Sequence, residues 1–359
     1  MPDPLFSLII GSLILIVIGV LFWPERGLVS RWRAVRRMND RILHEDALKH
    51  VQKLELSGRS ATLQSVAGAL GIDTNRAVTL IMELESLGLL QRNGERLNLT
   101  PQGGQVAMNV IRAHRLWEHY LAEHTGYKPS EWHSQAERFE HDFTPEELDQ
   151  LAGSLGHPLY DPHGDPIPSK EGQMYDHSAT RLGDLEAGTM ARIVHIGDEP
   201  ETVAAQIEAE GLLPGMLVQV HEKTSQRIRF WSNGDEHVLA PIVAASINVQ
   251  PLEEQSVELP KAGIPLNELK QGQQARIVQL SPRLRGPERR RLMDLGMLPG
   301  TEITADLSSP LGDPIGYRVR DSLIALRAAQ ASCIRVEIIN NEEQKQQKNL
   351  VESSQEVTL

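Results

Sequence analysis

Residues 132–141 bring together two histidines and two glutamates whose spacing suits metal binding. On a helix, His133, Glu137, Glu140 and His141 occupy positions i, i+4, i+7 and i+8, so their side chains leave from one face. The apolar residues of the segment form a separate stripe that can bury the helix without them. For this segment alone, a solvated polar face is the simpler alternative.

A second predicted helix, over about residues 102–125, adds two more side chains of the same kinds. His114 and Glu118 lie one turn apart on it. Mixed imidazole and carboxylate donors suit a divalent transition metal such as manganese, iron, cobalt or zinc, whereas calcium and magnesium prefer oxygen donors alone. The two segments together therefore predict a class of metal, without choosing the metal.

Residues 45–101 show the pattern of a winged helix-turn-helix. A helix is expected over 46–56, a second begins at the N-cap Thr62, and a third is capped by Asp73 or Thr74 after a three-residue turn. The pair Asn93 and Gly94 lies between two short strands, which is a strong hairpin signal and predicts the wing.

DNA recognition is the interpretation we favour for this region, although its charges nearly cancel and contacts to protein are the alternative. Side chains at the start of the third helix, and one on the wing, are placed to reach base edges and phosphates. These candidate DNA-binding residues are Thr74, Asn75, Arg76, Thr79 and Arg92.

The C-terminal half contains an internal repeat. The segment 188–194 recurs as 272–278, and the Gly-x-Leu-Pro-Gly turn at 211–215 recurs at 296–300. Agreement in both motif and spacing indicates two copies of one unit, each with the strand and turn pattern of a small β-barrel. Between the metal-binding region and the first copy, His157 and His163 fall in a proline-dense connector, where they are more simply turn residues than ligands.

The N-terminus carries an uncharged apolar stretch from Leu5 to Trp23, long enough to cross a bilayer as a helix. A cleaved signal peptide is the alternative, but no basic residue precedes the stretch and no small residues follow it. The arginines after it predict a single-pass inner-membrane anchor with the bulk of the chain cytoplasmic. They are Arg26, Arg31, Arg33, Arg36, Arg37 and Arg41.

Charge and cysteine content narrow the possible classes of protein. A formal net charge of −12 argues against a protein that coats nucleic acid without specificity, though not against a small site-specific reader. The single cysteine, Cys333, excludes a disulfide scaffold and a cysteine-rich zinc site.

Over about residues 45–168 the chain resembles the diphtheria-toxin-repressor family of metal-dependent transcriptional regulators. The resemblance rests on the helix-turn-helix, the His114 helix and the run Glu137-Arg-Phe-Glu-His141. It implies a homodimer that binds an operator in double-stranded DNA, with iron(II) or manganese(II) between the winged helix and a helical dimerisation domain. The two repeats look like the SH3-like domain of the ferrous-iron transport accessory protein A.

The resemblance also implies the ligands. Asp46, Glu137, Glu140 and His141 match the primary metal site, whereas His114, Glu118 and His133 match an ancillary site. Manganese-type members have a further ligand where this chain has Lys49, whose ammonium has no lone pair, so a paired metal site is in doubt. His50, one turn after Asp46, could substitute.

The expected fold class is multidomain α+β, with an N-terminal transmembrane helix, a winged helix-turn-helix, a helical metal-binding and dimerisation domain, and two small SH3-like β-barrels. The expected ranges are 1–24 for the anchor, 25–44 for a basic juxtamembrane segment, 45–101, 102–168, 181–252 and 264–340 for the four domains, and 341–359 for a disordered tail.

The resemblance implies that the function is repression of metal-uptake genes, and we expect no enzymatic activity. One rival is a membrane-tethered metal sensor or adaptor that acts on a transporter through its SH3-like domains and has lost DNA binding. The other is a metallohydrolase, which the absence of a His-Glu-x-x-His run disfavours.

Overall fold

The computed structural model describes residues 28–175, 178–232, 235–252, 263–309 and 312–339, with residues 28–38 described by their backbone alone. Two compact units account for the chain. The first contains the described residues up to 114, together with 138–150 and 168–174. The second contains residues 115–137, 151–167 and the described residues from 175 onward.

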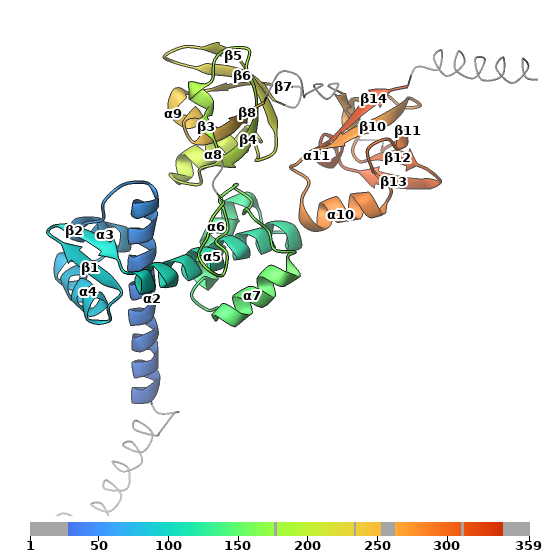
Figure 1. The fold of residues 1–359 in the computed structure, drawn as a ribbon. Helices are drawn as coiled ribbons and strands as arrows, with labels where there is room; N and C mark the ends of the chain where they lie inside the picture. The colour runs from blue at the N-terminus through green and yellow to red at the C-terminus, as the bar shows by residue number, and fades with distance from the viewer. Residues whose placement is uncertain (1–27, 176–177, 233–234, 253–262, 310–311, 340–359) are drawn as a thin grey trace, which may run out of the picture. The chain divides into compact units, whose positions relative to one another are not determined.

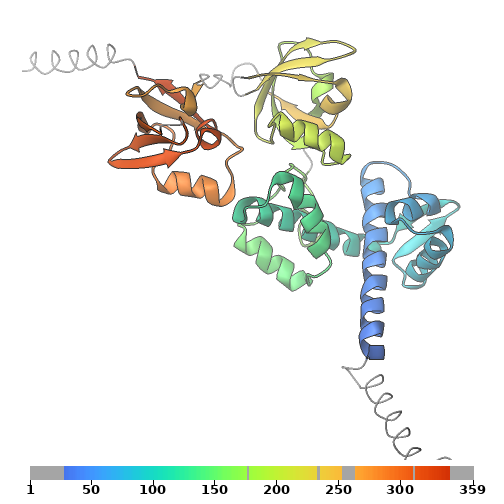
Figure 2. The same ribbon diagram turned by 180° about the vertical axis from the view of Figure 1, so that it is seen from behind.

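The first unit is built around a long helix, on one side of which a small α/β motif packs (Figures 1 and 2). Leu48 and Val51 of the long helix are fully buried with Leu80 and Leu84, which supplies the apolar core of the motif. The elements in order are α2 (Leu28–Leu56), α3 (Leu63–Leu70), α4 (Thr74–Ser86), β1 (Leu90–Asn93) and β2 (Arg96–Leu99). This is the predicted winged helix-turn-helix.

Local sequence explains where these helices begin. The Thr62 side chain accepts a hydrogen bond from the backbone N–H of Ser65, and the Ser65 hydroxyl accepts from the N–H of Thr62, which forms a capping box. Asp73 caps α4 by accepting from the N–H groups of Asn75 and Arg76. Strands β1 and β2 pair antiparallel, and Gly94 turns between them with a φ of 63°.

Three helices follow: α5 (Pro101–His124), α6 (Pro129–Phe139) and α7 (Pro145–Ser154). The boundary between the two units passes through α5 after His114. Helix α6 ends at Phe139, so the predicted helix over 132–141 is wrong at its last two residues. Glu140 and His141 lie in the turn that follows, and they leave the stripe that also holds His133 and Glu137.

The second unit contains two six-stranded antiparallel sheets with the same topology. The first sheet has the order β3-β8-β4-β5-β6-β7 and the second has β9-β14-β10-β11-β12-β13, so the strands correspond one to one. The bounds in the first are β3 (Thr180–Arg181), β4 (Met190–Ile196), β5 (Leu217–Lys223), β6 (Ile228–Ser232), β7 (Asp235–Leu239) and β8 (Ile247–Pro251). In the second they are β9 (Ile264–Pro265), β10 (Gln274–Leu280), β11 (Glu302–Ser308), β12 (Ile315–Val319), β13 (Ser322–Leu326) and β14 (Ile334–Ile338).

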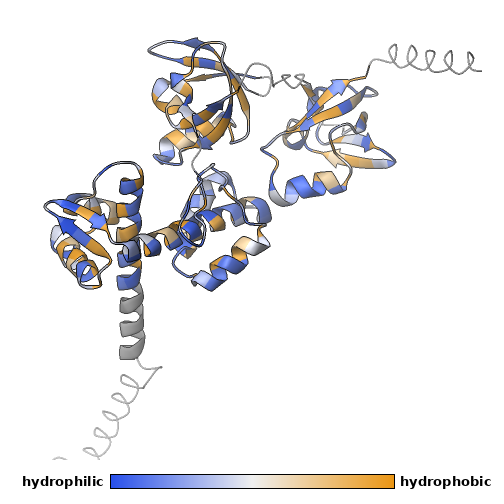
Figure 3. Cartoon of the chain, in the orientation of Figure 1, coloured by the Kyte–Doolittle hydropathy of each residue, from blue (hydrophilic) through white to orange (hydrophobic). Residues whose placement is uncertain are grey.

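Each sheet encloses its own apolar core and carries matching irregularities. The register shifts between Ile193 and His195 in β4 and between Ile277 and Gln279 in β10. Helices α8 (Glu201–Ala209) and α10 (Gly286–Asp294) follow these strands, and α9 (Pro241–Ala244) and α11 (Ala328–Ala331) are short turns before the last strands. Figure 3 shows hydrophobic and hydrophilic residues interleaved along the strands, as expected when one face is buried.

The described structure corrects the expectation of a membrane anchor. Its residues, Leu5–Trp23, lie outside the described residues, and among the described helices none is long and apolar enough to cross a bilayer. The long helix α2 carries charged residues in successive turns, including Asp40, Glu45 and Lys49, which would be costly within hydrocarbon. The transmembrane helix in the expected fold class and the inner-membrane location are thereby corrected, and the membrane as a partner is not supported.

Candidate metal centre

In the first unit, Asp46 of α2 meets Glu140 and His141 of the turn after α6. The ligand-type atoms of these three side chains lie within 4.8 Å of one another. His141 Nε2 is 3.1 Å from Asp46 Oδ1 and 3.5 Å from Glu140 Oε1. Glu140 and His141 are buried, whereas Asp46 is half-buried. We call these three residues the bridging cluster, because Asp46 belongs to the winged helix and the other two follow α6.

His141 is held in place by carboxylates on both sides of its ring. Its Nδ1 lies 2.6 Å from Glu45 Oε2, and its backbone carbonyl accepts a hydrogen bond from Arg41. Burial lowers the pKa of His141, but the hydrogen bonds to Asp46 and Glu45 outweigh it and raise that pKa to about 9. In the absence of metal, the imidazole is therefore protonated at neutral pH.

Glu140 receives two other partners. Lys49 Nζ lies 2.7 Å from each of its carboxylate oxygens, and His114 Nδ1 lies 2.5 Å from Oε2. Burial raises the pKa of Glu140, but the hydrogen bond to His114 and the charge of Lys49 have the larger combined effect and hold that pKa below its usual value.

Two predicted ligands lie outside the bridging cluster. His50 is not among the candidate ligand groups of the described residues, and its buried Nε2 has no hydrogen-bond partner there. Glu137 is 57% exposed and its carboxylate faces His133 at 3.4 Å. The early end of α6 explains this, since it separates Glu137 from Glu140 and His141.

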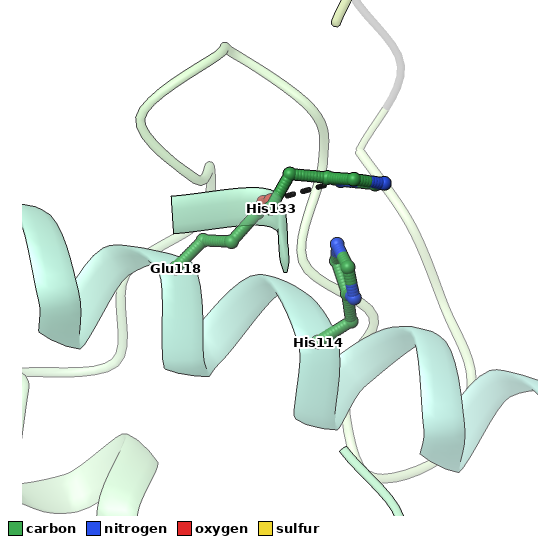
Figure 4. Close-up of side chains that lie close together, drawn as sticks. All are labelled: His114, Glu118 and His133. Carbon is green, nitrogen blue, oxygen red and sulfur yellow. Dashed lines mark ion pairs between the residues drawn. The ribbon is translucent and has the colours of Figure 1, made fainter. Parts of the chain in front are cut away.

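The second unit contains another group of donors, around Glu118 of α5. Glu118 is 1% exposed, and its Oε1 lies 3.4 Å from Nδ1 of His133 on α6. His114, which belongs to the first unit, precedes Glu118 by one turn of α5, and Figure 4 labels it together with Glu118 and His133. These are the residues expected to form the ancillary site.

Two further residues join Glu118 that the sequence interpretation did not assign. His163 Nδ1 lies 3.7 Å from Glu118 Oε2, and the ligand atoms of Glu118, His163 and Asp198 lie within 4.8 Å of one another. Asp198 follows β4 and also lies 3.1 Å from His133 Nδ1. We call Glu118, His133, His163 and Asp198 the Glu118 cluster.

The turn that presents His163 is organised by a buried carboxylate. Asp161 accepts hydrogen bonds from the backbone N–H groups of His163 and Asp165, and the carbonyl of His163 accepts from the N–H of Ile196 at the end of β4. His163, expected to be an ordinary turn residue, is thereby fixed beside the strand that leads to Asp198. The sequence signal that could have identified Asp198 is the acidic run 198–201, which the second repeat lacks.

Both imidazoles of the Glu118 cluster have raised pKa values. Hydrogen bonds to Asp198, Glu118 and Glu137 raise the pKa of His133 to about 12. Burial lowers the pKa of His163, but its interactions with Glu118 outweigh this and raise it to about 9. In the metal-free protein, protons occupy the nitrogens that a metal would use.

The residues present fit a divalent transition metal in both clusters, because each supplies carboxylate oxygens together with imidazole nitrogen. In the Glu118 cluster, the buried Nδ1 of His163 has no hydrogen-bond partner among the described residues, so it has a lone pair or proton to exchange.

The candidate DNA-binding residues lie where the winged helix would present them. Thr74, Asn75 and Thr79 are exposed on the first turns of α4, and Arg92 is exposed on β1. Arg76 differs, because its guanidinium pairs with Asp40 of α2 at 2.7 Å and is 31% exposed.

Comparisons with known proteins point to metal-dependent repressors. Residues 100–169 match the family described as the metal-binding and dimerisation domain of iron-dependent repressors, and residues 264–338 match the FeoA domain. The iron-dependent repressor IdeR of Mycobacterium leprae is 28% identical over 219 residues, which is 57% of this chain and 95% of that protein. A Porphyromonas gingivalis fusion of Fe(2+) transport protein A with the Fe(2+) transporter FeoB is 40% identical over 76 residues, 21% of this chain and 9% of that protein.

The structure is also similar to solved repressors. A manganese-dependent transcriptional repressor in complex with manganese aligns with a TM-score of 0.52 at 25% identity, over 57% of this chain and 100% of the other. The resemblance to iron- and manganese-dependent repressors is therefore confirmed, as is the FeoA-like character of the second repeat.

Proposed function

We propose that the protein is a transcriptional repressor that iron(II) or manganese(II) activates for operator binding, and that it acts as a homodimer. The similarity to IdeR and to a manganese-dependent repressor supports the regulatory function and the metals. The match of residues 100–169 to a dimerisation domain supports the homodimer.

One observation carries the mechanism: a residue of the winged helix lies among donors that follow α6. Asp46 is on α2, the helix that supplies Leu48 and Val51 to the core of the winged helix, whereas Glu140 and His141 belong to the segment after α6. A divalent cation bound by these three side chains would link the winged helix to the segment after α6.

Asp46 and His141 then determine how the winged helix is oriented. Asp46 lies on α2, which shares its apolar core with α4. A cation that holds Asp46 in place would therefore also limit the positions that the exposed residues Thr74, Asn75 and Thr79 can take. Two recognition helices of a dimer bind one operator only at a matched spacing, so a ligand that favours that arrangement raises DNA affinity by linkage.

The experiment is a footprint on DNA selected by the full chain from random duplexes, with manganese(II), iron(II), zinc(II) or a chelator present. We expect a footprint with iron(II) or manganese(II) that the chelator removes. A chain that binds metal but protects no DNA would instead fit a sensor or adaptor, to which the FeoA-like second repeat would be relevant. Hydrolytic turnover dependent on Glu140 would favour an enzyme.

A further inference from the structure

The ammonium group of Lys49 lies beside the bridging cluster and contacts one of its carboxylates. Lys49 Nζ is 2.7 Å from both carboxylate oxygens of Glu140, so the contact is bidentate. The Lys49 side chain is 11% exposed and that of Glu140 is 2% exposed. This is a shielded pair, unlike the exposed ion pairs on protein surfaces that contribute little.

In the metal-free protein, this pair offsets the free-energy cost of burying the Glu140 carboxylate. A buried carboxylate without a compensating charge is costly, because it has lost its hydration and gained no partner in exchange. The imidazole of His114 adds a hydrogen bond to Glu140, but Lys49 supplies a permanent positive charge. Glu140 is therefore neutralised before any metal arrives.

The charges around the cluster also limit how many ions it can take. Three carboxylates, those of Glu45, Asp46 and Glu140, surround His141, and they face two cations, Arg41 and Lys49. Once the His141 imidazole has lost its proton, as it must to bind metal, the group has one net negative charge. A single divalent ion already reverses that sign, so a second ion would meet net positive charge at close range.

We propose that Lys49 is a built-in counter-cation of the bridging cluster, which neutralises Glu140 in the metal-free protein and limits the cluster to one divalent ion. The proposal rests on the proposed function only in requiring that the cluster binds metal. An arriving ion shares Glu140 with Lys49 or displaces it, so Lys49 also sets the metal concentration at which the cluster fills.

The test counts manganese(II) ions and measures their affinity by isothermal titration of the metal-free full chain. All variants carry Glu118→Gln, which silences the Glu118 cluster so that the count reports the bridging cluster alone. Lys49→Gln removes the cation, and Lys49→Glu replaces it with a fourth carboxylate. The matched controls are Lys53→Gln and Lys53→Glu, at an exposed lysine one turn later on α2.

With Lys49 intact, we expect one ion per chain. Lys49→Gln should bind that ion at least about tenfold more tightly, because a like charge has been removed from its neighbourhood. Lys49→Glu should bind two ions, whereas both Lys53 variants should match the parent. An unchanged affinity in Lys49→Gln, or a single ion in Lys49→Glu, would overturn the proposal.

Thermal unfolding provides a second readout without metal or DNA. Metal-free Lys49→Gln should unfold at a lower temperature than metal-free Lys53→Gln, and Lys49→Arg, which keeps the charge, should recover most of the difference. Equal unfolding temperatures for Lys49→Gln and Lys53→Gln would refute the neutralising role. Failure of the proposed repressor function would appear separately, as metal binding without any effect on DNA binding.

Discussion

The two donor clusters are built from the same residue types but compensate their charges differently. In the bridging cluster, the buried carboxylate of Glu140 is paired with a permanent cation, Lys49. In the Glu118 cluster, the buried carboxylate of Glu118 faces two imidazoles, His133 and His163, whose pKa values are raised. A proton can leave an imidazole when metal binds, whereas the Lys49 ammonium must share Glu140 with the metal or move away from it. We therefore expect the two clusters to differ in metal affinity, pH dependence and effect on DNA binding.

The largest effect should come from Glu140→Gln. Glu140 contacts Lys49 and His114 and lies beside His141, so loss of its charge removes a ligand and leaves Lys49 uncompensated. The manganese(II) concentration needed to tighten DNA binding should rise by about 100-fold or more, judged against the 10- to 100-fold loss of metal affinity typical of residues that only support a ligand. Anisotropy of labelled operator DNA would measure it.

The matched control for that variant is Glu146→Gln, at an exposed glutamate on the first turn of α7. It should behave as the wild type. Equal metal dependence in Glu140→Gln and Glu146→Gln would remove Glu140 from the metal centre.

A smaller effect on DNA binding is expected from Glu118→Gln. Glu118 contacts His133 and His163, so the variant should lose the ion bound in its own cluster while the bridging cluster still fills. DNA affinity at saturating metal should fall by no more than about tenfold. A metal titration that counts the ions bound per chain would measure the loss of one ion. Glu123→Gln, on the same helix, is the control. A loss of DNA binding as large as that of Glu140→Gln would mean that the clusters act as one.

The pH dependence should separate the clusters further. Protonated His163 stabilises the metal-free fold fully below its reference pKa of 6.5, and this contribution is lost as pH rises through about 9. Metal must displace that proton, and the deprotonated fraction rises about tenfold per pH unit below the pKa, so affinity at the Glu118 cluster should rise by at least about tenfold between pH 6 and pH 7. Proton release during manganese titration in two buffers checks this. His163→Asn should release fewer protons than wild type, and an equal release would contradict the assignment.

The smallest expected change is that of Gly164→Ala, which alters no ligand. Gly164 has a φ of 92°, and a Cβ there would lie 2.0 Å from the carbonyl oxygen of Val194 in β4. The turn must shift, which changes the position of His163 relative to Asp198, so metal affinity at the Glu118 cluster should weaken severalfold, which corresponds to about 1 kcal/mol, the lower end of typical backbone strain. Gly153→Ala, in open space on α7, is the control. Wild-type affinity in Gly164→Ala would show that the cluster does not depend on this close approach.

Local signals explain how much of this fold was predictable. The caps at Thr62 and Asp73 and the turn at Gly94 depend on neighbouring residues, and the structure confirms all three. The internal repeat also predicted two sheets of one topology, because each copy forms its own core. The regulatory function and the choice of iron or manganese followed from the resemblance to a known family, whereas the residues alone predicted only a divalent transition metal.

Long-range contacts account for what was missed. Nothing near Lys49 in sequence indicates a partner at Glu140, and His163 and Asp198 are joined by a turn and a strand rather than by helical spacing. The end of α6 at Phe139 was missed because apolar periodicity continues to Phe143 in the sequence. The membrane helix was inferred from an apolar stretch and the arginines that follow it, and the described helices contain none that could cross a bilayer.

The measurement that tests the central claim most directly is operator binding by wild type and Asp46→Asn, each titrated with manganese(II). Asp46 is the only member of the bridging cluster, among the described residues, that the winged helix contributes. We predict that metal tightens DNA binding by the wild type at least about tenfold, within the range of ordinary coupling between sites. Asp46→Asn should keep the metal-free DNA affinity and lose the tightening. Full metal dependence in Asp46→Asn would contradict a metal bridge between the winged helix and the segment after α6.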